Sequence, residues 1–267
     1  MDLFFREVGD KEREIVIIHG LYGASDNWLS IANGLKDKFK IFLPDLRNHG
    51  KSPHSDELTY ELMVTDIHKF IKNKTSGKVI LMGHSMGGKV AMRFALEYPE
   101  MVDYLLVVDI APRNYGPQSN FGEETNQHPE ILKAMMDLDL SKAENRKDLD
   151  ELWKDQFRST QLRQFLLKNV QRGEDGKFHW QINVPVLQRE LTEIMDGFSS
   201  LKETKTYKGS SVLVIRGEKS TYFLDEDTMA LNTYFPGSQI VTIPNAGHWV
   251  HAEQPDLFLK TVLYFLD

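Results

Sequence analysis

The chain reads Val79-Ile80-Leu81-Met82-Gly83-His84-Ser85-Met86-Gly87 in its first third, and these residues indicate how the rest of it folds. Four apolar residues typical of a buried strand run into a glycine-flanked turn, and residues 87–98 continue as a predicted helix. The turn matches the pattern G-x-S-x-G, in which small neighbours relieve a strained backbone and leave the serine hydroxyl projecting above a sheet edge. This strand–turn–helix context predicts that Ser85 is a nucleophile.

Two other interpretations of the same turn are weaker. The first is a glycine-rich turn with a purely structural role. The second is a phosphate-binding loop, because Gly83, Gly88 and Lys89 match most of the pattern G-x-x-x-x-G-K-[ST]. The next residue is Val90, which has no hydroxyl to bind Mg²⁺, so the nucleophile remains the favoured interpretation.

Short apolar runs alternate with helix-like segments in the first 110 and the last 60 residues. Near-continuous apolar character is typical of strands that are buried on both faces of a parallel sheet. The predicted strands are 14–18, 40–43, 79–82, 104–108, 212–215 and 239–243. The predicted helices are 58–73, 87–98, 225–235 and 254–265. The alternation predicts an α/β fold with a mostly parallel central sheet flanked by helices, and ligand sites at the carboxyl ends of the strands.

Residues 113–206 follow a different pattern, with apolar residues at helical spacing, many charges and one short strand-like stretch, Phe178-His179-Trp180. We interpret this region as a helical insertion between two sheet strands, placed as a cap over the site. The predicted organisation is therefore a core of residues 1–112 and 207–267 with a cap of residues 113–206.

A serine hydroxyl needs a base to take its proton, and His248 is the histidine best placed for this role. It follows the strand 239–243, and Gly247 before it allows the backbone to turn the imidazole inward. His251, three residues further on, is the alternative base. Packing, turn or surface roles are the simpler expectation for the other histidines that we considered, namely His49, His54, His68, His84, His128 and His179.

The third member of such a site is a carboxylate that orients the imidazole, and Asp109 fits this role. It ends the strand 104–108 and so lies at the same sheet edge as Ser85. A turn or helix-capping role is the alternative, but a buried carboxylate at a strand end is costly without partners. The chain order is then Ser85, Asp109, His248.

Composition excludes several other classes of protein. The 267 residues are 41% hydrophobic and 27% charged, as in a soluble globular domain, and the net charge of −7 argues against nucleic-acid binding. With no cysteine, the chain has no disulfide, thiolate metal site or cysteine nucleophile. No signal-peptide pattern and no apolar run of ~20 residues is present, so we expect a cytoplasmic protein without a membrane span. The sequence does not indicate the oligomeric state.

Four motifs in order along the chain resemble the α/β-hydrolase superfamily. Gly83–Gly88 resembles its nucleophile elbow, His19–Gly23 its oxyanion loop, 44–52 its D-x-R-x-H-G-x-S loop, and Gly247-His248 its histidine loop. The amino-acid sequence at residues 47–50, 88–92 and 108–112 is most similar to that of the small bacterial acyl esterases called YbfF-like. Asn48 stands where many members have glycine, and asparagine tolerates the left-handed backbone conformation.

One departure from the family pattern concerns the acid. The usual acid follows the strand that is here 212–215, but Ser220 occupies that place. The YbfF-like resemblance implies a variant in which the acid moves to Asp109. Glu218, Asp225 and Asp227 are the rival carboxylates.

The resemblance implies acyl transfer to water, with the oxyanion bound by the backbone N–H groups of Leu21 and Met86 and with no metal or organic cofactor. A serine carboxylesterase acting on short- to medium-chain acyl esters is the first expectation. An acyl-CoA-type thioesterase, a carbon–carbon-bond hydrolase and a cofactor-free haloperoxidase are same-fold alternatives, and a non-catalytic binding module is an alternative of another class. The expected partner is a small-molecule ester or thioester.

Aromatic and methionine residues could form an apolar substrate pocket beneath the cap, although such residues are more often part of a core. Tyr22, Trp180 and Trp249 are the main candidates for substrate contacts. The further candidates are Trp28, Phe121, Met135 and Met136.

Overall fold

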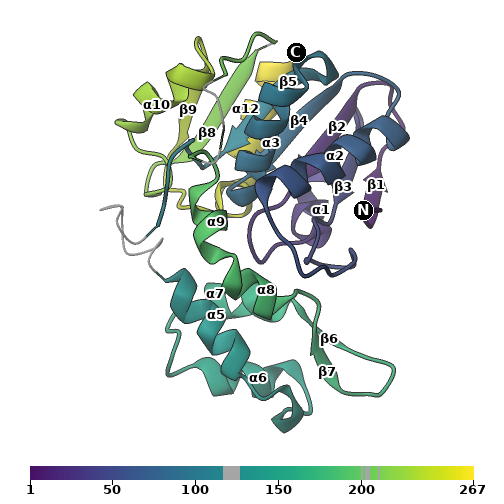
Figure 1. Cartoon of the computed structure of the whole chain (residues 1–267), viewed down its shortest axis with the longest axis vertical. Helices are drawn as coiled ribbons and strands as arrows, with labels where there is room; N and C mark the ends of the chain where they lie inside the picture. Colours follow the sequence, from purple (N-terminus) through teal and green to yellow (C-terminus); the bar gives the residue numbers. More distant parts are fainter. Residues whose placement is uncertain (117–126, 200, 202–204, 210) are drawn as a thin grey trace.

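The computed structural model describes residues 1–116, 127–199, 201, 205–209 and 211–267. Phe121, one of the candidate pocket residues, lies outside the described residues. A seven-stranded sheet forms the centre of the described chain, in the strand order β1-β3-β2-β4-β5-β8-β9 (Figure 1). Its strands are β1 (Phe5–Val8), β2 (Glu14–Ile18), β3 (Lys40–Pro44), β4 (Val79–His84), β5 (Val102–Val108), β8 (Val212–Gly217) and β9 (Gln239–Ile243).

All neighbouring strands of the sheet are parallel except β1, which pairs antiparallel with β3. The six predicted strands are all present, with bounds that differ by two residues at most. The sequence prediction missed β1, an edge strand with only partly buried side chains. The α/β fold with a mostly parallel sheet is thus confirmed.

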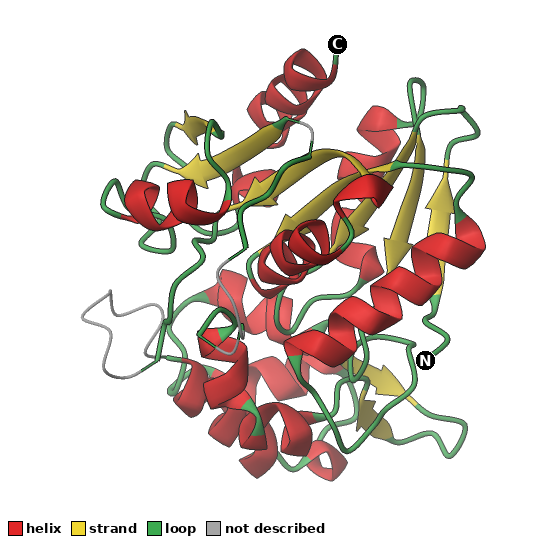
Figure 2. Cartoon of the chain, turned by 45° about the horizontal axis from the view of Figure 1, so that its top comes forward, coloured by secondary structure: helices red, strands yellow, loops and turns green. Residues whose placement is uncertain are grey.

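Helices cover both faces of the sheet (Figure 2). Alternate residues of β2 show why: Val16 and Ile18 join one apolar cluster, and Ile15 and Ile17 join the other. The first cluster includes side chains from α2 (Tyr60–Lys74), α3 (Met86–Glu97) and α10 (Asp227–Tyr234). The second includes side chains from α1 (Leu29–Leu35), α11 (Val250–Glu253) and α12 (Pro255–Leu266). The sequence prediction missed the short helix α1.

The chain between β5 and β8, which are neighbours in the sheet, forms a largely helical insertion. In Figure 1 it lies below the sheet, on the side toward which α3 begins. Its described elements are α5 (His128–Asp137), α6 (Arg146–Trp153), α7 (Thr160–Leu167), β6 (Val170–Arg172), β7 (Phe178–Trp180), α8 (Val184–Arg189) and α9 (Leu191–Asp196). The strand-like stretch at 178–180 has an antiparallel partner, β6, that the sequence analysis did not identify. Within the described residues, no helix has both the length and the apolar character needed to cross a bilayer.

Candidate active site

Ser85 occupies a strained turn between β4 and α3. Its backbone has φ 54° and ψ −124°, outside the regions that most residues adopt, and its N–H donates to the carbonyl of Val108 on the neighbouring strand (3.0 Å). The serine hydroxyl is thereby presented at the carboxyl edge of the sheet, where it faces a cavity.

The glycines on each side of Ser85 are required by space. A Cβ atom on Gly83 would collide with the carbonyl oxygen of Gly87, and a Cβ atom on Gly87 would collide with that of His19. The first glycine lets α3 begin close to the end of β4, and the second lets α3 pack against the end of β2. The G-x-S-x-G pattern thus has a direct steric cause in this chain.

Asp109 and His248 form a hydrogen-bonded pair at the same edge. The Nδ1 atom of His248 lies 2.8 Å from Oδ2 of Asp109, whose carboxylate is fully buried. Two further donors reach this carboxylate: the N–H of Gly217 (2.9 Å to Oδ1) and the hydroxyl of Ser220 (to Oδ2). The buried charge is therefore satisfied from three directions, which fixes its orientation toward the imidazole.

Burial sets the protonation of this pair. It lowers the pKa of His248 below the usual value, so the ring is neutral at pH 7 and Nε2 is free to accept a proton. Burial also raises the pKa of Asp109, while the hydrogen bonds from Ser220 and Gly217 act in the opposite direction and favour the carboxylate. The pair has the arrangement in which an acid selects the imidazole tautomer that can act as a base.

None of the three rival carboxylates bonds to His248. Glu218 accepts from the N–H of Asn245, and Asp225 forms an ion pair with Arg216 while 92% of its side chain is exposed. Asp227 is buried, but it pairs with Arg113 and accepts from the N–H of Leu224. Ser220, at the position of the family's usual acid, instead supports Asp109.

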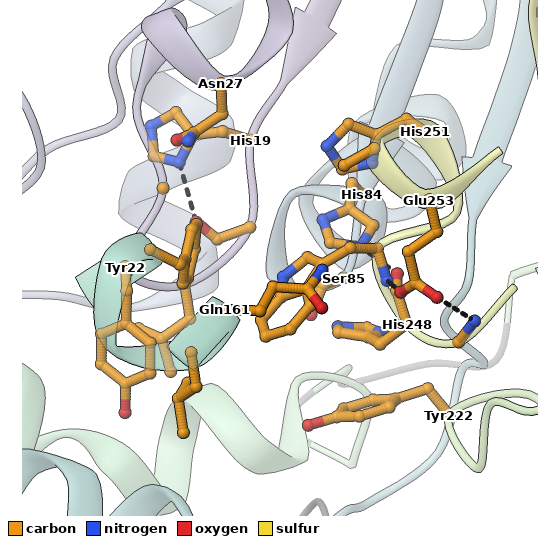
Figure 3. A pocket seen from close by; sticks show the side chains of 18 of the residues that line it. His19, Tyr22, Asn27, His84, Ser85, Gln161, Tyr222, His248, His251 and Glu253 are labelled. Carbon is orange, nitrogen blue, oxygen red and sulfur yellow. Dashed lines mark hydrogen bonds between the residues drawn. The ribbon is translucent and has the colours of Figure 1, made fainter. Parts of the chain in front are cut away.

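Two more histidines lie beside His248 (Figure 3). His84 donates from Nε2 to the backbone carbonyl of His248 (2.8 Å) and so helps to hold its loop. His251, the alternative base, stacks on Trp28 with ring centroids 4.0 Å apart and forms no ion pair with a carboxylate in the described chain.

Tyr222 and His128 are site residues that the sequence analysis missed as such. The ring of Tyr222 stacks on that of His248 at 3.7 Å between centroids, and Figure 3 shows the two rings lying flat against each other. His128 of α5 lies between two tyrosine hydroxyls, at 3.0 Å from Tyr222 Oη and 3.3 Å from Tyr22 Oη. The only available signal was that residue 222 closely follows a strand end, and nothing in the sequence marked His128.

A cavity of about 690 Å³ opens in front of Ser85 and His248. Three of the candidate pocket residues, Tyr22, Trp28 and Trp249, line it. Within the described chain, Trp180 does not line it but stacks on Trp153 at 5.9 Å, so its assignment as a substrate contact is not supported by this geometry. Two further candidates for the pocket, Met135 and Met136, do not line this cavity either. Met135 is buried in the core, and Met136 is exposed.

The candidate oxyanion donors are Met86, which directly follows Ser85 in the chain, and Leu21, which lines the same cavity as Ser85. Met86 is the first residue of α3, so its N–H has no acceptor within the helix, and Leu21 follows Gly20 in the loop after β2. Among the described residues, no group of three or more His, Asp or Glu side chains is arranged to bind a metal ion.

Comparison with known proteins gives evidence on the family of the chain. Residues 14–255 match the family described as alpha/beta hydrolase fold. The chain is 37% identical to the sn-1-specific diacylglycerol lipase ABHD11 of Danio rerio over 94% of its own length and 78% of the relative's. It is 32% identical to the esterase YbfF of Escherichia coli K12, over 95% of this chain and 92% of that one.

A solved structure described as a marine microorganism esterase superposes with a TM-score of 0.93 at 42% identity, over 99% of both chains. These relatives are enzymes named for the hydrolysis of esters, and this chain is likewise a hydrolase of carboxylic esters. The chain belongs to the α/β-hydrolase family.

Proposed function

We propose that the protein is a serine carboxylesterase that hydrolyses its substrate through an acyl-enzyme intermediate formed on Ser85. The observation that carries the proposal is the His248–Asp109 hydrogen bond at the same sheet edge as Ser85, with Ser85 and His248 lining one cavity. A nucleophile, a neutral base and an orienting carboxylate are the parts that this chemistry needs.

In the first half of the reaction, Ser85 Oγ forms a bond to the carbonyl carbon of the ester while His248 Nε2 takes the hydroxyl proton. The bond from carbon to the leaving oxygen then breaks, and His248 gives that proton to the departing alcohol. Water repeats the sequence on the acyl-enzyme, which releases the carboxylic acid and regenerates Ser85. Asp109 orients the imidazole and stabilises the imidazolium that forms.

The N–H groups of Leu21 and Met86 bind the oxyanion in this proposal. Met86 directly follows Ser85, Leu21 lines the cavity with it, and one such donor typically contributes about 3–4 kcal/mol to stabilising the transition state. We also propose that residues 113–206 act as a cap, because His128 of the insertion reaches the cavity in front of Ser85. The substrate is then a small-molecule ester held between the sheet edge and the insertion.

The test is hydrolysis of p-nitrophenyl acetate by the wild type and by Ser85→Ala. We expect the variant to lose activity by about 10⁴-fold or more, with an unchanged circular dichroism spectrum. Ser30→Ala, on the exposed surface of α1, is the matched control and keeps full activity. Equal rates for Ser85→Ala and the wild type would remove Ser85 as the nucleophile, and inactivity of the folded wild type toward every ester would favour a binding module.

A further inference from the structure

Two cavities meet at Ser85. The larger has a volume of about 690 Å³ and the smaller about 20 Å³. Four residues line both and form the wall between them, namely Leu21, Ser85, His128 and Tyr222. An ester that is attacked by Ser85 has two arms, and the two cavities offer each arm a different amount of room.

The position of the base decides which arm enters which cavity. His248 lines the larger cavity and is absent from the lining of the smaller one, whereas Met86, a candidate oxyanion donor, lines only the smaller one. The leaving oxygen must lie within hydrogen-bond reach of His248 to receive its proton. The alcohol arm therefore lies in the larger cavity, and the acyl arm extends from the carbonyl carbon into the smaller one.

The smaller cavity has room for one or two heavy atoms, since a single water already needs roughly 10–15 Å³. The larger one is of the size that holds drug-sized ligands, typically about 300–1,000 Å³. We propose that the enzyme is selective for esters of very short acids, acetyl or propanoyl, with bulky alcohol arms, and that Ile194 and Met195 set this limit. The inference rests on the esterase mechanism proposed above.

The wall formed by Ile194 and Met195 is held in place by core side chains. These two residues lie near the end of α9 and line the smaller cavity. Tyr60 Oη donates to the carbonyl of Ile194 (2.8 Å), and Lys89 Nζ donates to the carbonyls of Met195 (2.8 Å) and Asp196 (2.6 Å). Both donors are almost fully buried, so moving α9 outward would leave a hydroxyl and an ammonium without these acceptors.

Arg93 of α3 donates in the same way to the carbonyl of Gly197 (2.9 Å). Side chains of α2 and α3 therefore bind four consecutive carbonyls at the carboxyl end of α9. Cations are favoured at this end of a helix. Gly88 and Lys89, which match part of a phosphate-loop pattern, thus have another role. Lys89 holds the insertion against the core beside the smaller cavity.

His128 closes the wall between the two cavities. Its hydrogen-bonding distances to Tyr22 Oη and Tyr222 Oη span the gap from the oxyanion loop to the loop after β8. Burial lowers the pKa of His128 to about 4, so the ring is neutral and can donate to one hydroxyl while accepting from the other. The smaller cavity is therefore bounded by His128 where it meets the larger cavity, and by Ile194 and Met195 of α9 elsewhere.

The experiment compares two isomeric esters, hexyl acetate and ethyl hexanoate, which contain the same atoms but place the six-carbon chain on opposite arms. We expect kcat/KM of the wild type for hexyl acetate to exceed that for ethyl hexanoate by tenfold or more. A preference for ethyl hexanoate that depends on Ser85 would overturn the acyl assignment while leaving the esterase mechanism intact. If the folded wild type hydrolysed neither ester, or if Ser85→Ala hydrolysed both as fast as the wild type, the proposed mechanism itself would be contradicted.

Met195→Ala enlarges the acyl cavity, and we expect it to reduce the preference for hexyl acetate at least fivefold by raising kcat/KM for ethyl hexanoate. The matched control is Met229→Ala on α10, whose side chain is 82% exposed and which keeps the wild-type ratio. Ile194→Val is the milder variant if Met195→Ala does not fold, with a smaller change in the same direction. If a folded Met195→Ala protein kept the wild-type ratio of the two kcat/KM values, the role of Ile194 and Met195 would be contradicted. The ratio measured for the wild type decides by itself which arm of the ester enters which cavity.

Discussion

Asp109 accepts hydrogen bonds from three groups: the ring of His248 in the loop after β9, the N–H of Gly217 at the end of β8, and the hydroxyl of Ser220 in the turn that follows β8. Serine stands at residue 220, where the resemblance places the family's usual acid, and its hydroxyl donates to this carboxylate. The hydroxyl of Ser220 now stabilises a carboxylate that comes from the preceding sheet strand. Oδ2 of Asp109 thus accepts from both the Ser220 hydroxyl and the His248 ring.

The first prediction concerns Asp109→Asn. The amide retains the shape of the side chain but cannot favour the required histidine tautomer, so we expect kcat to fall by about 10⁴-fold. Steady-state kinetics with p-nitrophenyl acetate measures this loss, and thermal unfolding shows that the fold persists. Asp225→Asn, an exposed aspartate near the same edge, is the control and keeps wild-type kcat. A mild effect of Asp109→Asn beside a large effect of Asp225→Asn would assign the acid differently.

The second prediction concerns pH. Protonation of His248 removes the base, and burial lowers the pKa of this ring. Burial raises the pKa of its partner Asp109 to about 7, but the proton that blocks the base is the one on His248 Nε2. The acid limb of kcat/KM should therefore have its midpoint below ~6.5, the usual histidine value, with activity maintained down to that pH. The enzyme is kept at pH 7.5 and diluted into each assay buffer just before the initial rate is measured. Protonation of the site is then observed before the protein has time to unfold. A midpoint above pH 7 contradicts the predicted direction.

The three strands that carry the candidate site were all predicted from the sequence, β9 with its bounds and β4 and β5 to within two residues. Ser85, Asp109 and His248 follow β4, β5 and β9, and parallel strands bring their carboxyl ends to one edge. The edge strand β1 and the short helix α1 were missed because such elements are stabilised by tertiary contacts more than by a pattern of their own. Tyr222 and His128 were missed as site residues because a loop and the insertion bring them together without any periodic signal.

The third prediction tests the junction of β4 and α3. In Gly83→Ala the new methyl group meets the carbonyl of Gly87, so the turn must open and we expect a loss of about 3 kcal/mol or more in the free energy of unfolding. Gly77→Ala is the matched control, because its Cβ would meet no atom within 4 Å and its φ is not positive. Urea unfolding measures both variants. Equal stability of the two proteins would contradict the steric account of the elbow.

Across the molecule as a whole, burial lowers the pKa of six described histidines. They are His19, His49, His84, His128, His248 and His251. In the unfolded chain each takes up a proton near pH 6.5, whereas in the folded protein each resists protonation until a lower pH. Asp109 and Glu193 act in the opposite direction, because burial raises the pKa of each carboxyl and the folded state then binds their protons first. Six histidines outweigh these two groups, so the unfolded state binds more protons below pH 6.5 and acid favours unfolding.

The fourth prediction follows from this difference in proton binding. The free energy of unfolding should be steady between pH 7 and 8 and should fall steeply below pH 6.5, with each titrating histidine contributing up to about 1.4 kcal/mol per pH unit. Urea unfolding at pH 8, 7, 6 and 5 measures the slope. A free energy that stays constant from pH 7.5 to 5.5 would show that these rings are not held neutral by the fold.

Covalent labelling with a fluorophosphonate, followed by peptide mass spectrometry, tests directly whether Ser85 is a nucleophile activated by His248. We expect one adduct, on Ser85, and at least 100-fold slower labelling in a folded His248→Ala variant because the base is missing. Folded wild-type protein that gains no adduct, or gains one on a different serine, would contradict the claim.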